Sequence, residues 1–112
     1  MITHGPTDFQ KKVYEKLYEV PKGKVTTYAD LAHAVGIASP RAIGQALKRK
    51  PSAPIIPCHR VVASDGSIGG FFGQMQGRHV ARKIALLRKE RVVVREGKVL
   101  DFDAVRYRSF DP

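Results

Sequence analysis

The stretch "TYADLAHAVGIASPRAIGQALKRK", residues 27–50, predicts two short helices joined by a tight turn. Thr27 is a suitable N-cap for the first helix, and Gly36 suits the position just after its last turn. Ser39 then caps a second helix, in which Pro40 takes the first helical position. Because so few residues separate the two helices, we expect a helix-turn-helix over about residues 27–50.

The second helix of this stretch has two chemically different faces. Ile43, Ala46 and Leu47 share one side at helical spacing, which predicts that this side is buried. The opposite side carries the polar and basic residues expected to contact DNA: Arg41, Gln45, Lys48 and Arg49. A basic second helix is typical of a DNA-reading helix. A solvated basic helix without a partner is the common alternative.

Composition supports a nucleic-acid partner. The chain has 112 residues and a formal net charge of +10, from 20 Lys and Arg against 10 Asp and Glu. This excess favours a polyanion, although a basic protein without such a partner is also compatible with it. The length fits one domain over residues 1–112. No apolar run approaches the roughly 20 residues that cross a bilayer, and the N-terminus lacks a secretory layout. We therefore expect a monomer without membrane contact in the cytoplasm, or in the nucleus of a eukaryote.

The flanking segments complete the expected fold. Thr7 can cap a first helix that runs toward Pro21, and residues 78–90 predict another helix with an apolar stripe. Residues 91–102 predict two short strands around a Glu-Gly turn. The expected fold class is mainly α with a small β part, a winged-helix-like helix-turn-helix domain with short C-terminal strands.

Cys58 is the only cysteine, and it lies in the run "PIIPCHRVV", residues 54–62. Only a few per cent of a free thiol is ionised at neutral pH, so a nucleophilic cysteine needs a base, and a carboxylate can orient that base. His59 is adjacent, but neighbouring side chains of an extended segment point in opposite directions, so a turn or a bridging water is needed. A buried, inert thiol is the alternative. Metal binding is disfavoured, because the histidines lack ligand spacing.

The run "IPCHRVV" follows the helix-turn-helix and precedes "GSIGGF" and "LLRKE". In this order the motifs strongly resemble the C-terminal domain of O6-alkylguanine-DNA alkyltransferases. The resemblance covers about residues 7–90, with an active-site loop over 54–73, and leaves the tail 91–112 outside it. It implies DNA repair by irreversible, stoichiometric transfer of an alkyl group, such as methyl, from O6-alkylguanine in double-stranded DNA to Cys58 after base flipping. It implies no cofactor and no metal.

The resemblance also implies roles for residues at the reacting base. His59 would act as a base through a water, with Glu90 orienting it. Tyr28 would help to rotate the nucleotide and would donate toward guanine N3. The carbonyls of Cys58 and Val61 would hold the guanine amino group. No second cysteine is present to resolve the product, so each molecule is expected to react once, as a single-turnover methyltransferase.

On the DNA side, the resemblance implies that Arg41 fills the place vacated by the flipped base. Ala42 and Gly44 are the small residues that let the reading helix enter the minor groove. Phe72, in the substrate site, stands where the family has a small hydroxyl residue, so the hydrogen bond to the substrate oxygen must come from the backbone or be lost. Lys50 replaces a bracing asparagine.

Two other functions stay open at this point. Alkyltransferase-like proteins lack the family's additional N-terminal domain, which is also not expected here, and bind alkylated DNA without accepting the group. Such a lesion-sensing protein usually has tryptophan in place of the cysteine, so Cys58 favours transfer. A helix-turn-helix transcription regulator is the more distant alternative.

Overall fold

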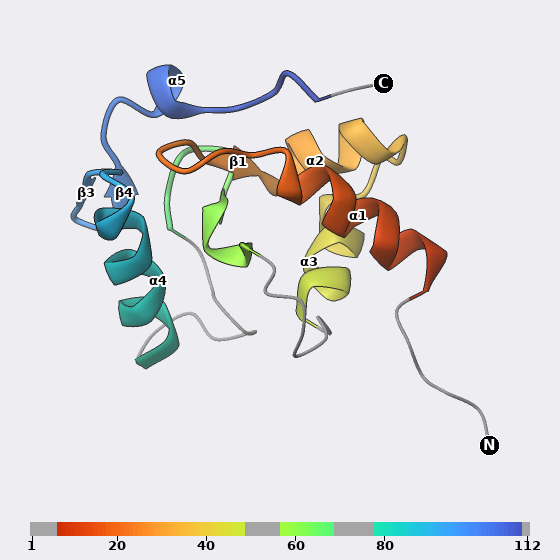
Figure 1. The fold of residues 1–112 in the computed structure, drawn as a ribbon, viewed down its shortest axis with the longest axis horizontal. Helices are drawn as coiled ribbons and strands as arrows, with labels where there is room; N and C mark the ends of the chain where they lie inside the picture. Colours follow the sequence, from red (N-terminus) through yellow and green to blue (C-terminus); the bar gives the residue numbers. More distant parts are fainter. Residues whose placement is uncertain (1–6, 49–56, 69–77, 111–112) are drawn as a thin grey trace.

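The first helix begins at the cap that the sequence predicts. The computed structural model describes residues 7–48, 57–68 and 78–110 (Figure 1). Helix α1 spans Asp8–Tyr18. The Thr7 hydroxyl accepts the Gln10 N–H at 3.1 Å, and the Gln10 side chain accepts the Thr7 N–H at 2.7 Å. This reciprocal pair satisfies two backbone donors that would otherwise lack helical partners, which fixes the start of α1.

The helix-turn-helix is present as expected. Helix α2 spans Tyr28–Val35 and helix α3 spans Pro40–Lys48. The Thr27 hydroxyl caps α2 by accepting the Asp30 N–H at 2.9 Å. Gly36 ends α2 with φ of 81°, a left-handed conformation that glycine adopts without steric cost. The chain can therefore turn sharply into α3.

The two faces of α3 divide as the periodicity predicts. Ile43, Ala46 and Leu47 are buried, whereas Arg41, Gln45 and Lys48 are exposed. Ala42 and Gly44 are half-buried. Arg49 lies outside the described residues, so the expected extension of this helix beyond Lys48 is not part of the description.

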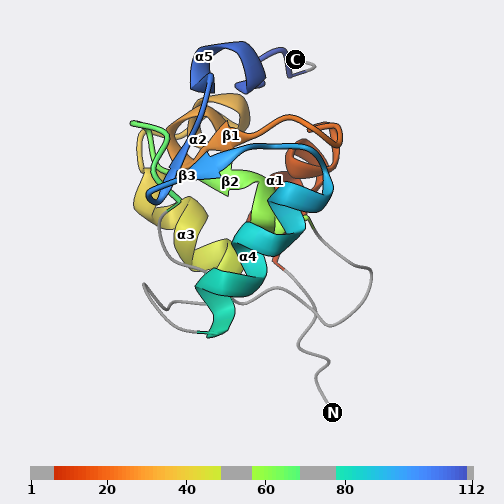
Figure 2. The same cartoon turned by 90° about the vertical axis from the view of Figure 1, so that its left-hand side faces the viewer.

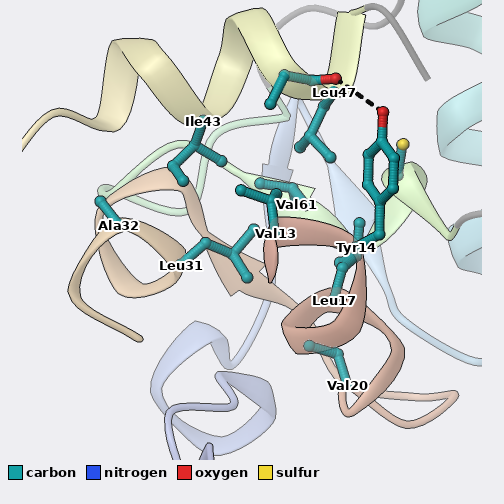
Figure 3. Close-up of a cluster of buried hydrophobic side chains, with 11 residues drawn as sticks. Val13, Tyr14, Leu17, Val20, Leu31, Ala32, Ile43, Leu47 and Val61 are labelled. Carbon is teal, nitrogen blue, oxygen red and sulfur yellow. Dashed lines mark hydrogen bonds between the residues drawn. The ribbon is translucent and has the colours of Figure 1, made fainter. Parts of the chain in front are cut away.

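The main core lies where α1, α2 and α3 meet (Figure 3). Val13, Leu17, Leu31 and Ile43 are fully buried there, and burying such a side chain stabilises the fold by about 1.5–3 kcal/mol. The Tyr14 hydroxyl donates to the Ala46 carbonyl at 3.2 Å, which joins α1 to the last turns of α3 (Figure 3). Helix α3 is therefore held from its buried side.

A short parallel strand pair connects the helix-turn-helix to the segment that contains the cysteine. Strand β1, Thr26–Thr27, pairs with strand β2, Val61–Val62. A 3₁₀ turn, η1, spans Cys58–Arg60 and leads directly into β2. Helix α4, Arg78–Lys89, packs against this turn (Figure 2). Parallel pairing of residues so far apart leaves no local signal in the sequence.

The expected C-terminal strands are confirmed. Strands β3, Val94–Arg95, and β4, Lys98–Val99, form an antiparallel pair around the Glu-Gly turn. Val94 and Val99 join Ile68 and Leu87 in a second buried cluster. The fold class is therefore the expected one, mainly α with a small β part. Within the described ranges, no helix combines the length and apolar character needed to cross a membrane.

The last described segment contains an element that the sequence did not predict. Helix α5, Phe102–Val105, follows β4, and a parallel bridge then joins Arg106 to Val25. Phe102 lies against Gly66, where a Cβ atom would come within 3.0 Å of its ring. This close approach disfavours a side chain at position 66, and the φ of 86° there also favours glycine.

Candidate active site

Cys58 occupies the first position of the η1 turn and is only 7% exposed. Its side chain belongs to the core cluster formed by α1, α2 and α3. The backbone turns here, with the Val61 N–H donating to the Cys58 carbonyl. The segment is therefore not extended at this point, and the objection that adjacent side chains must point in opposite directions does not apply.

His59 and Glu90 lie in contact, although 31 positions separate them in the sequence. The His59 Nε2 atom is 2.9 Å from Glu90 Oε2, and the two side chains are only 12% and 11% exposed. Burial is the main cause that lowers the pKa of His59, against the opposing effect of Glu90. The imidazole is therefore mostly neutral at pH 7. Because an ionised carboxylate only accepts hydrogen bonds, Nε2 carries the proton and Nδ1 keeps a free lone pair.

Arg60 holds the same carboxylate and was assigned no role from the sequence. Its Nε and Nη2 atoms donate to the two oxygens of Glu90 at 2.9 and 2.8 Å, and Nη1 donates to the Val20 carbonyl at 2.9 Å. Burial would raise the pKa of Glu90, but the hydrogen bonds from Arg60 and His59 outweigh it and lower the pKa to about 2. Glu90 is thus a fixed anion beside the imidazole.

Lys83 is the second residue of this region that sequence reasoning missed. It is 0% exposed, and its Nζ atom donates to the carbonyls of Val61 and Ile68 at 2.6 and 2.7 Å. Burial lowers its pKa to about 8, against the smaller opposing effect that a Cys58 thiolate would exert. The sequence did contain a signal, because Lys83 lies within the apolar stripe of α4. A lysine at such an inward position is expected to have buried polar partners.

The carbonyls expected to hold the guanine amino group already accept hydrogen bonds. The Cys58 carbonyl accepts the Val61 N–H, and the Val61 carbonyl accepts Lys83. A carbonyl oxygen has two lone pairs, so one hydrogen bond does not by itself prevent a carbonyl from accepting a second donor. Phe72, the other expected substrate contact, lies outside the described residues.

Tyr28 is the first residue of α2 and packs against the core cluster that contains Cys58. Burial raises its pKa, and a Cys58 thiolate would raise it further. A Cβ atom placed on Gly44 would lie 4.0 Å from Tyr28 Cε1, so the tyrosine ring lies against α3. Tyr28 therefore contacts both α3 and the core cluster to which Cys58 belongs.

Arg41, Gln45 and Lys48 form an exposed row on α3, on the side opposite its core residues. This row has the charge and helical position that a phosphate-contacting surface requires. Among the residues that the structure describes, no group of three or more His, Cys, Asp or Glu side chains could hold a metal ion.

Comparison with known sequences identifies relatives of this chain. The family model described as "6-O-methylguanine DNA methyltransferase, DNA binding domain" matches residues 8–92. A methylated-DNA--protein-cysteine methyltransferase from Thermococcus kodakarensis is 57% identical over 63 residues, 55% of this chain and 36% of that protein. The enzyme of that name from Saccharolobus solfataricus is 44% identical over 88 residues, 79% of this chain and 54% of that protein. The chain thus spans about a third to a half of the length of these relatives.

Solved structures show the same fold. S. pombe Atl1, in complex with damaged DNA containing O6-carboxymethylguanine, gives a TM-score of 0.78 at 29% identity, over 96% of this chain and 98% of that chain. The O6-methylguanine-DNA methyltransferase of Pyrococcus kodakaraensis gives 0.62 at 48% identity, over 75% of this chain and 46% of that chain. The chain therefore belongs to the family of the 6-O-methylguanine DNA methyltransferase DNA-binding domain.

Proposed function

We propose that this protein repairs DNA by moving an alkyl group from the O6 atom of guanine in a duplex to Cys58. The observation that carries the proposal is the contact between His59 Nε2 and Glu90 Oε2 at 2.9 Å. His59 directly follows Cys58 in the η1 turn. The names of the curated relatives support the same reaction. Each chain reacts once, because the product is a stable thioether.

In the proposed reaction, His59 accepts the thiol proton of Cys58 through a water molecule at Nδ1. The thiolate sulfur attacks the alkyl carbon, the bond between that carbon and O6 breaks, and the electron pair of this bond stays on the guanine. Tyr28 donates toward N3 of the departing base. Glu90 stabilises the imidazolium that forms, and Arg60 holds Glu90 in place. The sulfur gains one alkyl group, and the guanine anion takes up one proton from solvent as His59 later releases the proton of the thiol, which restores the guanine.

The target atom of a stacked base is inaccessible to the buried thiol, so the nucleotide must leave the duplex. Flipping costs a few kcal/mol, least for a damaged base. Arg41 lies on the exposed face of α3 and offsets part of this cost by occupying the vacated stack. Ala42 and Gly44 keep the helix narrow enough to approach the minor groove, and Lys48 contacts phosphate.

A second function is supported by one specific observation. The likeness to S. pombe Atl1, solved with damaged DNA containing O6-carboxymethylguanine, covers 96% of this chain and so extends into the segment beyond residue 92, whereas the Pyrococcus kodakaraensis enzyme is matched over 75% of it. A protein that binds alkylated DNA without accepting the alkyl group is therefore the competing proposal.

Mass spectrometry separates these two functions. After incubation with a duplex containing O6-methylguanine, the peptide that contains Cys58 should gain the mass of one methyl group. Cys58→Ser should bind the same duplex and gain none. Tight binding by the parent protein with no change in the Cys58 peptide would establish the lesion-sensing function instead.

A further inference from the structure

The C-terminal segment of the described chain runs beside the start of α2 (Figure 1). The Val25 N–H donates to the Val105 carbonyl at 2.9 Å, and the Tyr107 N–H donates back to the Val25 carbonyl. The Thr26 hydroxyl donates to the Tyr107 carbonyl at 3.0 Å. The segment thus adds a third extended piece next to β1, immediately before α2 begins.

One ion pair joins this segment to α2 itself. Arg106 donates through Nε to Asp30 Oδ2 at 2.8 Å and through Nη2 to Asp30 Oδ1 at 2.9 Å. The two side chains are 23% and 11% exposed. Burial would raise the pKa of Asp30, but the hydrogen bond from Arg106 contributes to a net lowering. Two parallel hydrogen bonds between planar groups fix both the distance and the orientation of the pair.

Asp30 lies in the first turn of α2, two residues after Tyr28. Its backbone N–H is bound by the Thr27 hydroxyl, and its carboxylate is bound by Arg106. On the other side of this turn, the Tyr28 ring lies against Gly44 of α3. The start of α2 is therefore held between α3 and the C-terminal segment.

We propose that Arg106 is a positioning residue for nucleotide rotation, and that it acts by fixing the helical turn that carries Tyr28. The inference rests on the proposed function, in which Tyr28 helps to rotate the damaged nucleotide. A side chain that displaces a stacked base needs a rigid backbone beneath it, because a small displacement of a functional side chain can greatly reduce the rate of the step that it assists. Helix α2 has only eight residues, and Tyr28 is the first of them. A force on the Tyr28 side chain during rotation therefore acts on the first turn of a short helix.

Arg106 also lies outside residues 8–92, which match the family model. The segment beyond that match therefore contributes directly to the arrangement of a residue inside it. The anchoring differs from general stabilisation because the ion pair contacts the very turn that carries Tyr28.

The test measures base unstacking and does not require alkyl transfer. A duplex carries 2-aminopurine beside O6-methylguanine, and the 2-aminopurine fluorescence rises when its neighbour leaves the stack. All proteins carry Cys58→Ser, so that no transfer ends the complex. At saturating protein, Arg106→Gln should slow the fluorescence rise about tenfold. Arg106→Lys should recover only part of this loss, because an ammonium does not provide the two-pronged geometry.

Arg95→Gln is the matched control, since it removes one positive charge from an exposed position on β3. It should leave the rate unchanged. Combining Arg106→Gln with Asp30→Asn should slow the rise no further than either change alone, because both break the same pair. A merely structural role would lower the thermal midpoint and leave unstacking unchanged well below that midpoint.

Two results would overturn the inference: an unchanged rate in Arg106→Gln, or an equal loss in Arg95→Gln. Absence of any rise with Cys58→Ser alone would overturn the rotation step together with the role of Arg106. The mass of the Cys58 peptide reports on transfer separately, so the two failures are distinguishable.

Discussion

Two carboxylates in this protein, Glu90 and Asp30, are each held by two hydrogen bonds from an arginine, and each is 11% exposed. Only Glu90 also contacts an imidazole. The same kind of ion pair therefore holds two different structures. Arg60 fixes the Glu90 anion beside the His59 imidazole, whereas Arg106 is bound to the first turn of α2. The difference lies in the surroundings of each carboxylate: Glu90 contacts the His59 ring, whereas Asp30 belongs to the first turn of α2.

The largest expected effect separates the two carboxylates on a substrate that needs no rotation. With free O6-methyl-2′-deoxyguanosine, Glu90→Gln should slow methyl transfer to Cys58 by roughly 10²–10⁴-fold, the usual contribution of general-base assistance. Asp30→Asn breaks an equivalent arginine pair that does not contact His59, so it should slow this rate far less, and only through the hydrogen bond from Tyr28 to N3. Single-turnover rates with saturating nucleoside provide the measurement. Equal rates for Glu90→Gln and the parent would leave Cys58 with a different activator.

Acid unfolding should show what the two carboxylates share. The pKa of Glu90 is lowered to about 2 and that of Asp30 is also lowered, so both bind protons more weakly in the folded state than in the unfolded state. Their contributions to the free energy of unfolding are present above about pH 4.5 and are lost as the pH falls toward 2. Urea titrations between pH 6 and pH 3 should show a smaller loss of stability for Glu90→Gln and for Asp30→Asn than for the parent. A parent-like loss in both variants would contradict these ion pairs.

The smallest expected effect concerns DNA affinity. Neither carboxylate lies on the exposed row of α3, so both variants should keep the salt dependence of duplex binding found in the parent. Lys48→Gln should instead reduce the slope of log affinity against log salt by about 0.9, the value for one phosphate contact. Titrations at several salt concentrations give these slopes. A slope change in Glu90→Gln as large as that in Lys48→Gln would place the carboxylate in the DNA interface.

The helix-turn-helix could be predicted because its signals are local. The Thr27 cap, the Gly36 end and the periodicity of α3 each depend on residues within a few positions. The pairing of His59 with Glu90 came from the resemblance, since no spacing rule connects positions 31 apart. Arg106 and Asp30 are 76 positions apart, and nothing in either neighbourhood indicates the partner.

Lys83 shows a different limit of sequence reasoning. Its inward position on α4 could be read from the apolar stripe, but its partners are backbone carbonyls of Val61 and Ile68. Any residue type offers such carbonyls, so only the fold could identify them. The same holds for the parallel pairing of β1 with β2.

If each chain accepts one alkyl group and no more, the stoichiometry of the reaction shows it. The protein is incubated with an excess of duplex containing O6-methylguanine, and both restored guanine and methylated Cys58 are counted over time. Restored guanine should reach a plateau at one per chain, with an equal amount of methyl on Cys58. Restored guanine that continues to accumulate beyond one per chain, or that never appears, would contradict it.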